Sequence, residues 1–365
     1  MRHFCSFILL LIALVACAQE DSVVTVDRNR WKHDLLHARL NLSDTTLYFP
    51  PALDVGVKLY RWGDHTFNYY DSTYVVGTGK KWKVMLKNTN WIDTYAGRLT
   101  QARTAIRMNS NVTSNFGLHL AYMALSLEYM VDINRLLGGK NLKNRHLEFS
   151  FTSSRIAIET YYIKNSSNTN MHRLGDYHEW SFRKGAAYKF TGLKRESYGV
   201  YGYYIFNHEH YAQAAAYCFS KIQRRSAGSF IGGIHLSRQD VNMDFSVMSE
   251  LMQSYLPDER RNYRFKYRDF CLLLGYGYNW VPHRRWLFNI TAIPSLGYRH
   301  SFPTSIEGEK GLLSTNIRGK TAIILNRGNY FYGLHLIGDA HWYHSRKYSF
   351  VNTNVDLNVT SGFRF

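Results

Sequence analysis

The chain has little of what marks helical membrane proteins and disulfide-stabilised secreted domains. Only 6 of its 365 residues are proline and only 4 are cysteine, and two of these cysteines, Cys5 and Cys17, lie in the first 17 residues. The remaining Cys218 and Cys271 could form a single bridge, but they exclude a disulfide framework, and we expect two free thiols. Its one long apolar run, residues 7–16, is shorter than the roughly 20 residues that a membrane-spanning helix needs. The mean hydropathy is −0.33. These shortages exclude a bundle of transmembrane helices.

The N-terminus has the pattern of an export signal. Arg2 precedes the apolar run, and Ala16-Cys17-Ala18 forms an A-x-A cleavage site. We expect cleavage between Ala18 and Gln19, which makes residues 1–18 a signal peptide. The alternative is a lipobox, Leu14-Val15-Ala16-Cys17, which would leave Cys17 lipidated at the new N-terminus. Both alternatives predict export from the cytoplasm.

What the chain does have is aromatic residues, at 16%, and long stretches of alternating apolar and polar residues. The alternation is strict in Val351–Phe365 and recurs in Lys266–Trp280, Leu313–Arg327 and Asn329–Ser345. Strands of this length are rare in soluble sandwiches, whereas in an outer-membrane barrel the apolar face meets lipid and the polar face lines the lumen. The pattern therefore predicts an all-β fold, a transmembrane antiparallel up-and-down β-barrel.

We expect about twelve strands, within a range of 10 to 14, because Ala52–Trp62 and Tyr74–Leu86 would supply another pair. Residues 103–365 are assigned to the barrel, and residues 19–102 to a periplasmic region or a plug in the lumen. The expected strands are 103–112, 116–132, 146–163, 178–190, 193–206, 211–222, 227–239, 265–280, 286–299, 313–327, 329–345 and 348–365.

Four stretches resemble a known family: Tyr74–Gly79, Ala214–Ser229, Gly275–Trp280 and Gly362–Phe365. The family is an uncharacterised Bacteroidetes group of secreted outer-membrane β-barrels, catalogued as a domain of unknown function. The resemblance implies a location in the bacterial outer membrane, but it implies no activity, substrate or catalytic residue. The terminal Phe363 and Phe365 are similar to the signal by which the barrel-assembly machinery binds its clients during insertion.

The predicted lumen carries charge of both signs. By alternation Arg318 and Lys320 point into the lumen, and Arg299 and Arg364 have the same parity. An excess of inward cations would favour the passage of anions through a pore. A barrel of twelve strands is also narrow enough to be filled by side chains or by the N-terminal region. We therefore expect a passive or anion-favouring pore, or a structural scaffold. The lumen-lining candidates are Asp269, Arg318, Lys320, His335, Asp339, His341 and Asp356.

An enzyme is the alternative, because Asp339, His341 and Ser345 are the residue types of acyl transfer. A lipid-modifying enzyme of the acyl hydrolase type would need them in contact, yet residues 339 and 345 are roughly 20 Å apart along a strand. The His208-Glu209-His210 spacing lacks the further ligands of a metal site. We therefore predict no catalytic residue, no metal and no cofactor.

The excess of 45 Lys plus Arg over 27 Asp plus Glu gives a net charge of +18. An exported chain without a basic recognition helix is not predicted to bind nucleic acid. We expect its anionic partners to be outer-membrane lipids and lipopolysaccharide, whose phosphates attract Lys and Arg. The sequence does not fix the oligomeric state.

Overall fold

The computed structural model describes residues 30–36, 44, 46–80, 82–99, 104–122, 125–132, 145–165, 169–178, 187–256 and 260–365. The chain divides into two compact units, Met1–Thr66 and Phe67–Phe365. The predicted signal peptide, with its cleavage at Ala18 and Gln19 or lipidation at Cys17, lies outside the described residues.

The first unit contains α2 (Arg30–Leu36) and nearly all of α3 (Pro51–Asn68). The alternative that Ala52–Trp62 is a strand is therefore wrong. Pro51 occupies the first helical position, where its missing N–H costs nothing, and Asp54 pairs with Lys58 one turn later, at 2.8 Å. No helix among the described residues is both long and apolar enough to cross a membrane.

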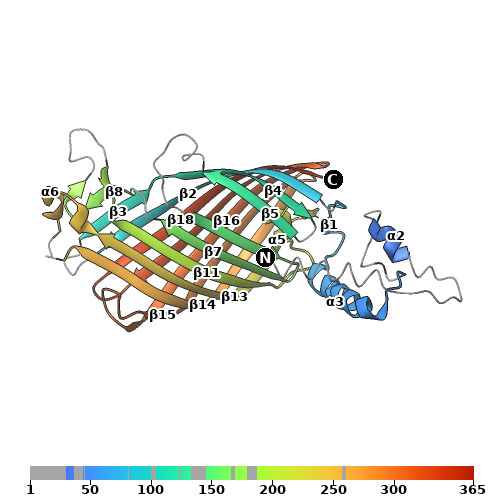
Figure 1. Ribbon diagram of the computed structural model, residues 1–365, viewed down its shortest axis with the longest axis horizontal. Coiled ribbons are helices and arrows are strands. Elements are labelled where there is room, and N and C mark those ends of the chain that lie inside the picture. The colour runs from blue at the N-terminus through green and yellow to red at the C-terminus, as the bar shows by residue number, and fades with distance from the viewer. Residues whose placement is uncertain are drawn as a thin grey trace. The chain divides into compact units, whose positions relative to one another are not determined.

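The second unit is an antiparallel sheet whose strands run obliquely side by side (Figure 1). Among the described residues, twelve of its strands have eight or more residues. They are β2 (Trp82–Arg98), β4 (Thr113–Tyr122), β5 (Leu125–Asp132), β6 (Arg145–Thr152), β7 (Ile156–Asn165), β11 (Leu193–Ile205), β13 (Ala227–Asp244), β14 (Asn262–His283), β15 (Trp286–Ser301), β16 (Lys310–Arg327), β17 (Tyr330–His344) and β18 (Ser349–Arg364).

The remaining elements are short. They are β1 (Val75–Gly77), β3 (Ala105–Ser110), β8 (Thr169–Leu174), β9 (Tyr177–His178), β10 (Tyr188–Phe190), β12 (Lys221–Gln223), α5 (Gln213–Tyr217), α6 (Glu250–Gln253) and a 3-10 turn, η2 (Phe245–Val247).

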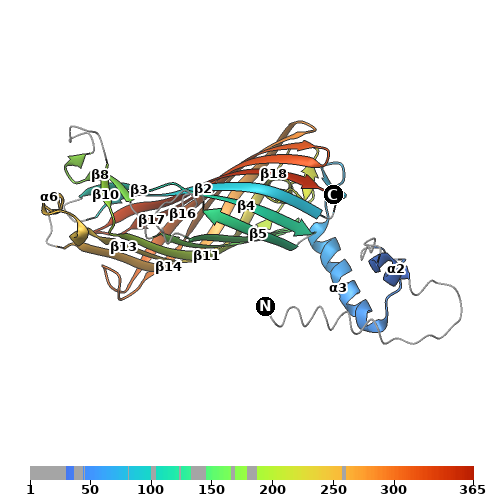
Figure 2. The same ribbon diagram turned by 45° about the horizontal axis from the view of Figure 1, so that its top comes forward.

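The sheet curls until its first long strand meets its last. Strands β13 to β18 pair in chain order, and β18 then pairs with β2 from Ser349↔Arg98 to Arg364↔Lys83 (Figure 2). Each long strand pairs only with near neighbours in sequence apart from this closing pair. The predicted fold, an antiparallel up-and-down β-barrel, is confirmed.

Several predicted boundaries differ from the structure. The sheet begins at Trp82 rather than at residue 103, because β2 pairs with β18. The expected strands 116–132 and 146–163 are each a hairpin, β4 with β5 and β6 with β7. In the second hairpin the Ser153 hydroxyl accepts the backbone N–H of Ile156 at 3.0 Å, a polar turn that the sequence pattern did not resolve.

The two ends of the barrel differ. The short turns at 284–285 and 328–329 lie at the same end as Phe365, and Gly328 supplies the left-handed backbone (φ 63°) of the second turn. We call this the turn end. The opposite end, which we call the loop end, carries residues 245–256, 260–261 and 302–309. In outer-membrane barrels short turns face the periplasm and long loops face outward.

The outer face of the sheet is apolar. Along β14, Phe270, Leu272 and Leu274 point outward with 50%, 72% and 66% of their surface exposed. Large exposed aromatic side chains gather at the turn end, among them Trp82, Trp280, Tyr330 and Phe365. Soluble monomers rarely expose contiguous apolar surfaces of this extent, whereas a barrel in lipid requires them, with aromatic residues at its borders.

Candidate functional site

The interior of the barrel is the candidate site, because the chemistry-bearing side chains converge there. All seven lumen-lining candidates lie on the inner face of the sheet and are at most 9% exposed. Asp269 comes from β14, Arg318 and Lys320 come from β16, and the other four come from β17 and β18. The two-residue period of a strand places them on one face.

A charged network crosses the middle of the lumen. Arg318 donates from Nη2 to Oε2 of Glu159 at 2.9 Å and from Nη1 to Asp339, while Lys320 also binds Glu159. Tyr201 donates its hydroxyl to Oδ1 of Asp339 at 2.8 Å. Strands β7 and β16 belong to distant parts of the sheet order, so these bonds join opposite walls and occupy the space between them.

Two further ion pairs fill the lumen toward the loop end. Arg299 binds Asp269 through two hydrogen bonds of 2.6 and 2.7 Å. Arg195 binds Asp93, whose other hydrogen bonds come from Asn165 and Asn354 at 2.9 and 3.1 Å. Desolvated charges persist only when they are paired in this way.

These ion pairs change the charge that we infer for the lining of the lumen. The sequence suggested an excess of inward cations, but Glu159 and Asp93 lie on strands whose inward face was not assigned from sequence. Together with Asp339, these carboxylates balance Arg318, Lys320 and Arg195. The middle of the lumen is therefore neutralised internally rather than lined by free cationic charge.

The structure does not bring the acyl-transfer residues together. Asp339 is held by Arg318 and Tyr201, as above. His341 contacts Oδ1 of Asn316 through Nδ1 at 3.1 Å, and the Ser345 hydroxyl donates to the backbone oxygen of Tyr348. Each residue has a different partner, so no nucleophile, base and orienting carboxylate form a chain.

His335 and Asp356 also have specific partners. Nε2 of His335 lies 2.8 Å from the backbone oxygen of Ala216. Oδ1 of Asp356 lies 3.1 Å from Nδ1 of His146, whose Nε2 lies 3.3 Å from Glu148. The two nitrogens of His146 face different carboxylates, an arrangement that suits a bridging ion pair better than one shared metal ion.

Residues 207–226 close the turn end of the lumen, and we call them the inner segment. The expected strand at 211–222 is wrong: the segment contains α5 and the short β12, which pairs with β1. Ala212, Ala214, Ala215 and Ala216 are buried. This run of alanines has high helix propensity and is small enough to pack inside a barrel, a signal that the alternation analysis passed over.

Polar side chains of the barrel wall bind the end of α5. Besides the contact from His335, Lys83 donates to the backbone oxygen of Cys218 at 2.9 Å, and Arg364 donates to that of Phe219 at 3.1 Å. These contacts satisfy carbonyl groups that a helix leaves unpaired at its C-terminal end. Arg364 thus serves the inner segment rather than an anion path.

The inner segment also reaches the charged network. Gln213 donates to Oε1 of Glu159 at 3.3 Å, and Nζ of Lys320 lies 4.1 Å from the ring centre of Tyr217. The Tyr211 hydroxyl accepts a hydrogen bond from Nδ2 of Asn289 at 3.1 Å and lies 3.4 Å from the hydroxyl of Thr291. The segment and the network therefore form one continuous packed interior. The two cysteines of the second unit, Cys218 and Cys271, are both free.

The loop end is closed by apolar packing. A cluster of buried side chains from the wall and the loops fills it, rich in tyrosine, phenylalanine and methionine. Its members include Tyr95, Met108, Met171, Phe190, Met243, Phe245, Met252, Tyr263, Phe265, Tyr343 and Phe350. The lumen thus has three filled layers: apolar at the loop end, charged in the middle, and the inner segment at the turn end.

Similarity to solved structures is weak. The outer membrane protein OprG of Pseudomonas aeruginosa aligns at 10% identity and a TM-score of 0.26, over 80% of this chain and 99% of that one. The translocator domain of the autotransporter NalP of Neisseria meningitidis aligns at 8% and 0.29, over 93% and 100%. The toluene transporter TodX of Pseudomonas putida aligns at 6% and 0.20, over 78% and 90%.

Likeness at these TM-scores carries no argument about activity, and no curated protein matches the chain. A family model matches residues 69–365, which include every strand of the barrel. The chain belongs to the family described as Domain of unknown function (DUF4421).

Proposed function

We propose that this protein is an integral β-barrel of the bacterial outer membrane with a closed lumen, and that it acts as a structural scaffold rather than as an open pore. The observation that carries the proposal is the contrast between an apolar outer face and an interior filled by paired charges and the inner segment. The paired charges and the inner segment, as far as the described residues go, occupy the space that a path for water and ions would need, whereas a scaffold needs only the wall and its loops.

A location in the bacterial outer membrane also requires that the chain is exported and inserted. An exported Bacteroidetes chain with a signal peptide at residues 1–18 would reach the outer membrane through the barrel-assembly machinery, for which Phe363 and Phe365 are the expected signal. Their rings support this role by position, since Phe365 stacks on Trp82 at 6.3 Å and on Phe363 at 6.0 Å at the turn end.

Planar-bilayer recording of the refolded full chain tests the closed lumen. We expect insertion without sustained conductance, because the network and the inner segment remain in place. Steady openings, and above all openings that favour anions, would overturn the closed-lumen proposal in favour of the pore. Insertion itself is verified separately by the slower electrophoretic mobility of the sample after heating, which marks a folded membrane barrel.

The acyl hydrolase alternative gains no support from the geometry, because Asp339, His341 and Ser345 are engaged elsewhere. Incubation of the refolded protein with labelled phospholipid tests it directly. Fatty acid release that disappears in His341→Ala would reinstate the enzyme.

A further inference from the structure

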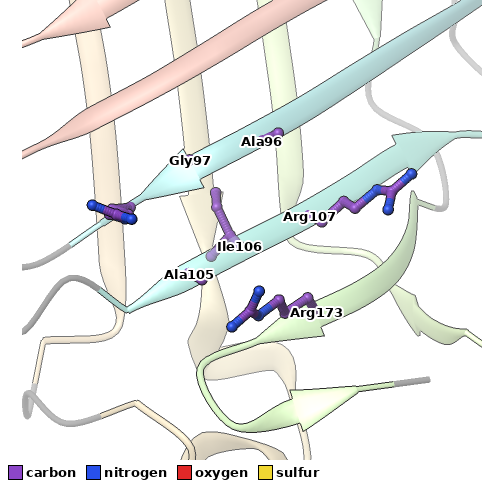
Figure 3. A pocket seen from close by; sticks show the side chains of 7 residues that line it. Ala96, Gly97, Ala105, Ile106, Arg107 and Arg173 are labelled. Carbon is purple, nitrogen blue, oxygen red and sulfur yellow. The ribbon is translucent and has the colours of Figure 1, made fainter. Parts of the chain in front are cut away.

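Three arginine side chains gather on the outer face of the sheet at the loop end. They are Arg98, the last residue of β2, with Arg107 on β3 and Arg173 on β8. Together with the small residues Ala96, Gly97 and Ala105 they line an open groove of about 450 Å³ (Figure 3). Because these small residues have no bulky side chains, the space between the arginines stays open.

The strand register holds these like charges together. Arg107 pairs directly with Arg173 across β3 and β8, and Arg98 pairs with Ala105, which places Arg98 diagonally beside Arg107. Like charges directly opposite each other destabilise a sheet. No ion pair joins any of the three to a carboxylate of another described residue. The protein thus concentrates positive charge here without neutralising it.

Three other outward arginines on the strands near the loop end, Arg238, Arg264 and Arg268, are compensated within the protein. Arg264 binds Asp240 through two hydrogen bonds of 2.9 and 2.7 Å. Arg238 and Arg268 also face each other across a strand pair, but both guanidinium groups lie 5.0 Å from the ring centre of Phe302. Nε of Arg173 donates to the backbone oxygen of Gly175 at 3.4 Å, but none of the three groove arginines has a carboxylate or an aromatic ring among the described residues as a partner, which favours an external anion.

The groove lies at the level of lipid headgroups if the barrel spans a membrane. On β18, Val351 pairs with Ala96 and Ser349 pairs with Arg98, so Arg98 lies two residue pairs beyond Val351, the last apolar outward residue of β18. From Phe363 to Ser349 the strand extends about 46 Å. At the usual strand tilt of about 35–45°, this length spans roughly 33–38 Å along the membrane normal. The apolar band is only about 25 Å tall, so Arg98 lies beyond it.

The apolar side of the groove suits a lipid better than a free ion. A second hollow of about 400 Å³ shares Ala96 and Arg107 with the first and extends toward Ile92, along β2 in the direction of the apolar band. A ligand with phosphate at one end and hydrocarbon at the other would occupy both hollows.

We propose that Arg98, Arg107 and Arg173 form a binding site for the phosphates of lipid A, the diphosphorylated glycolipid anchor of lipopolysaccharide in the outer leaflet. The guanidinium groups donate charge-assisted hydrogen bonds to phosphate oxygens, and the acyl chains lie over the apolar wall below. This inference rests on the proposed membrane location, because only there do the groove and the headgroups meet.

Binding of fluorescent diphosphoryl lipid A to the full chain in detergent micelles tests the site. The variant Arg98→Gln/Arg107→Gln/Arg173→Gln removes the three charges and keeps side chains of similar length. The matched control, Arg284→Gln/Arg285→Gln/Arg327→Gln, removes three exposed charges at the turn end. Heat-dependent mobility and circular dichroism establish that both variants fold.

We expect the groove variant to weaken lipid A binding by roughly tenfold or more, since it loses several charge-assisted contacts. The control should stay within about twofold of the natural chain, because its charges are solvated. Inorganic phosphate at the concentration of lipid A should not displace it. Equal affinity of the two variants would overturn the site, and displacement by inorganic phosphate would overturn the lipid assignment in favour of a free-anion site.

The same samples separate this inference from the proposed function. A chain that stays folded and monodisperse without detergent overturns the membrane location. A chain that needs detergent, folds as a barrel and binds lipid A equally well in both variants overturns only the arginine site.

Discussion

Two adjacent residues of β16 lie in the two different environments of this barrel, its outer face and its lumen. Ile317 points outward and is 42% exposed, whereas Arg318 points inward, is 5% exposed and binds Glu159 and Asp339. The outward residue needs only a surrounding apolar medium. The inward residue needs two specific partners from other strands. The outer face is therefore tolerant of exchange among apolar residues, and the inner face is not.

The largest effect is expected from breaking the inner network at Arg318. Arg318→Ala leaves Asp339 and part of Glu159 buried without a countercharge, and it should lower the free energy of unfolding by about 3–5 kcal/mol. The outward control Ile317→Ala should change it by about 0.5 kcal/mol or less. Urea unfolding in detergent, followed by tryptophan fluorescence, measures both.

A second variant keeps this prediction testable if Arg318→Ala fails to fold. Arg318→Met/Glu159→Gln/Asp339→Asn removes all three charges at once and should recover more than half of the lost stability, because no unpaired carboxylate remains. If Ile317→Ala and Arg318→Ala lowered the free energy of unfolding equally, the inner ion pairs would contribute no more to stability than an outward apolar side chain does.

The outer face is tested by placing a charge in the apolar band. Leu272 lies midway along β14, between the outward Ile234 and Leu296 on the neighbouring strands. Leu272→Arg should cost about 2–4 kcal/mol in a bilayer, whereas Tyr278→Arg, near the aromatic border at the turn end, should cost about 0–1 kcal/mol. Refolding equilibria in lipid vesicles measure the difference. Similar costs at both depths would contradict a lipid-facing band.

Alternation along β14 to β18 predicted which residues face inward and outward because the period of a strand decides this locally. It did not predict whether the lumen is open. That depends on Glu159 meeting Arg318, 159 positions apart, and on Asp93 meeting Arg195, 102 positions apart. Strand periodicity carries no information about such distant pairs.

The inner segment was mispredicted for a related reason. A strand was expected over 211–222 because the short segments 207–210 and 223–227 on either side of it were interpreted as turns between barrel strands. The buried alanines instead form α5 inside the lumen, held by Lys83 from β2 and Arg364 from β18. The groove arginines escaped prediction because β3 and β8 are short and become neighbours only through the folded register.

The next effect concerns how firmly the inner segment is held. Lys83→Gln removes the charged donor to the backbone oxygen of Cys218, which should make local opening of the segment easier by a factor of roughly ten. The rate of maleimide labelling at Cys218 measures this opening. Cys271, buried on β14, serves as the internal control and should stay unreactive.

Bilayer conductance should remain absent in Lys83→Gln, because the charged network still closes the middle of the lumen. If Cys218 reacts no faster while the barrel stays folded, the carbonyl contact contributes little to the position of the segment. If conductance appears, the inner segment alone closes the lumen and the charged layer is permeable.

The smallest effect on stability is expected at the C-terminal residue. The backbone of Phe365 exchanges two hydrogen bonds of 3.1 Å with Trp82, and these bonds persist in Phe365→Ala. The lost ring is 50% exposed, so the free energy of unfolding in detergent should fall by about 1 kcal/mol. In cells the same change should reduce the amount of inserted barrel far more, because the assembly machinery would bind the exposed ring before the strands pair. Heat-dependent mobility of membrane fractions measures insertion, with the outward Tyr330→Ala at the same end as the control. Equal insertion of the two variants would mean that Phe365 contributes only its share of the aromatic border.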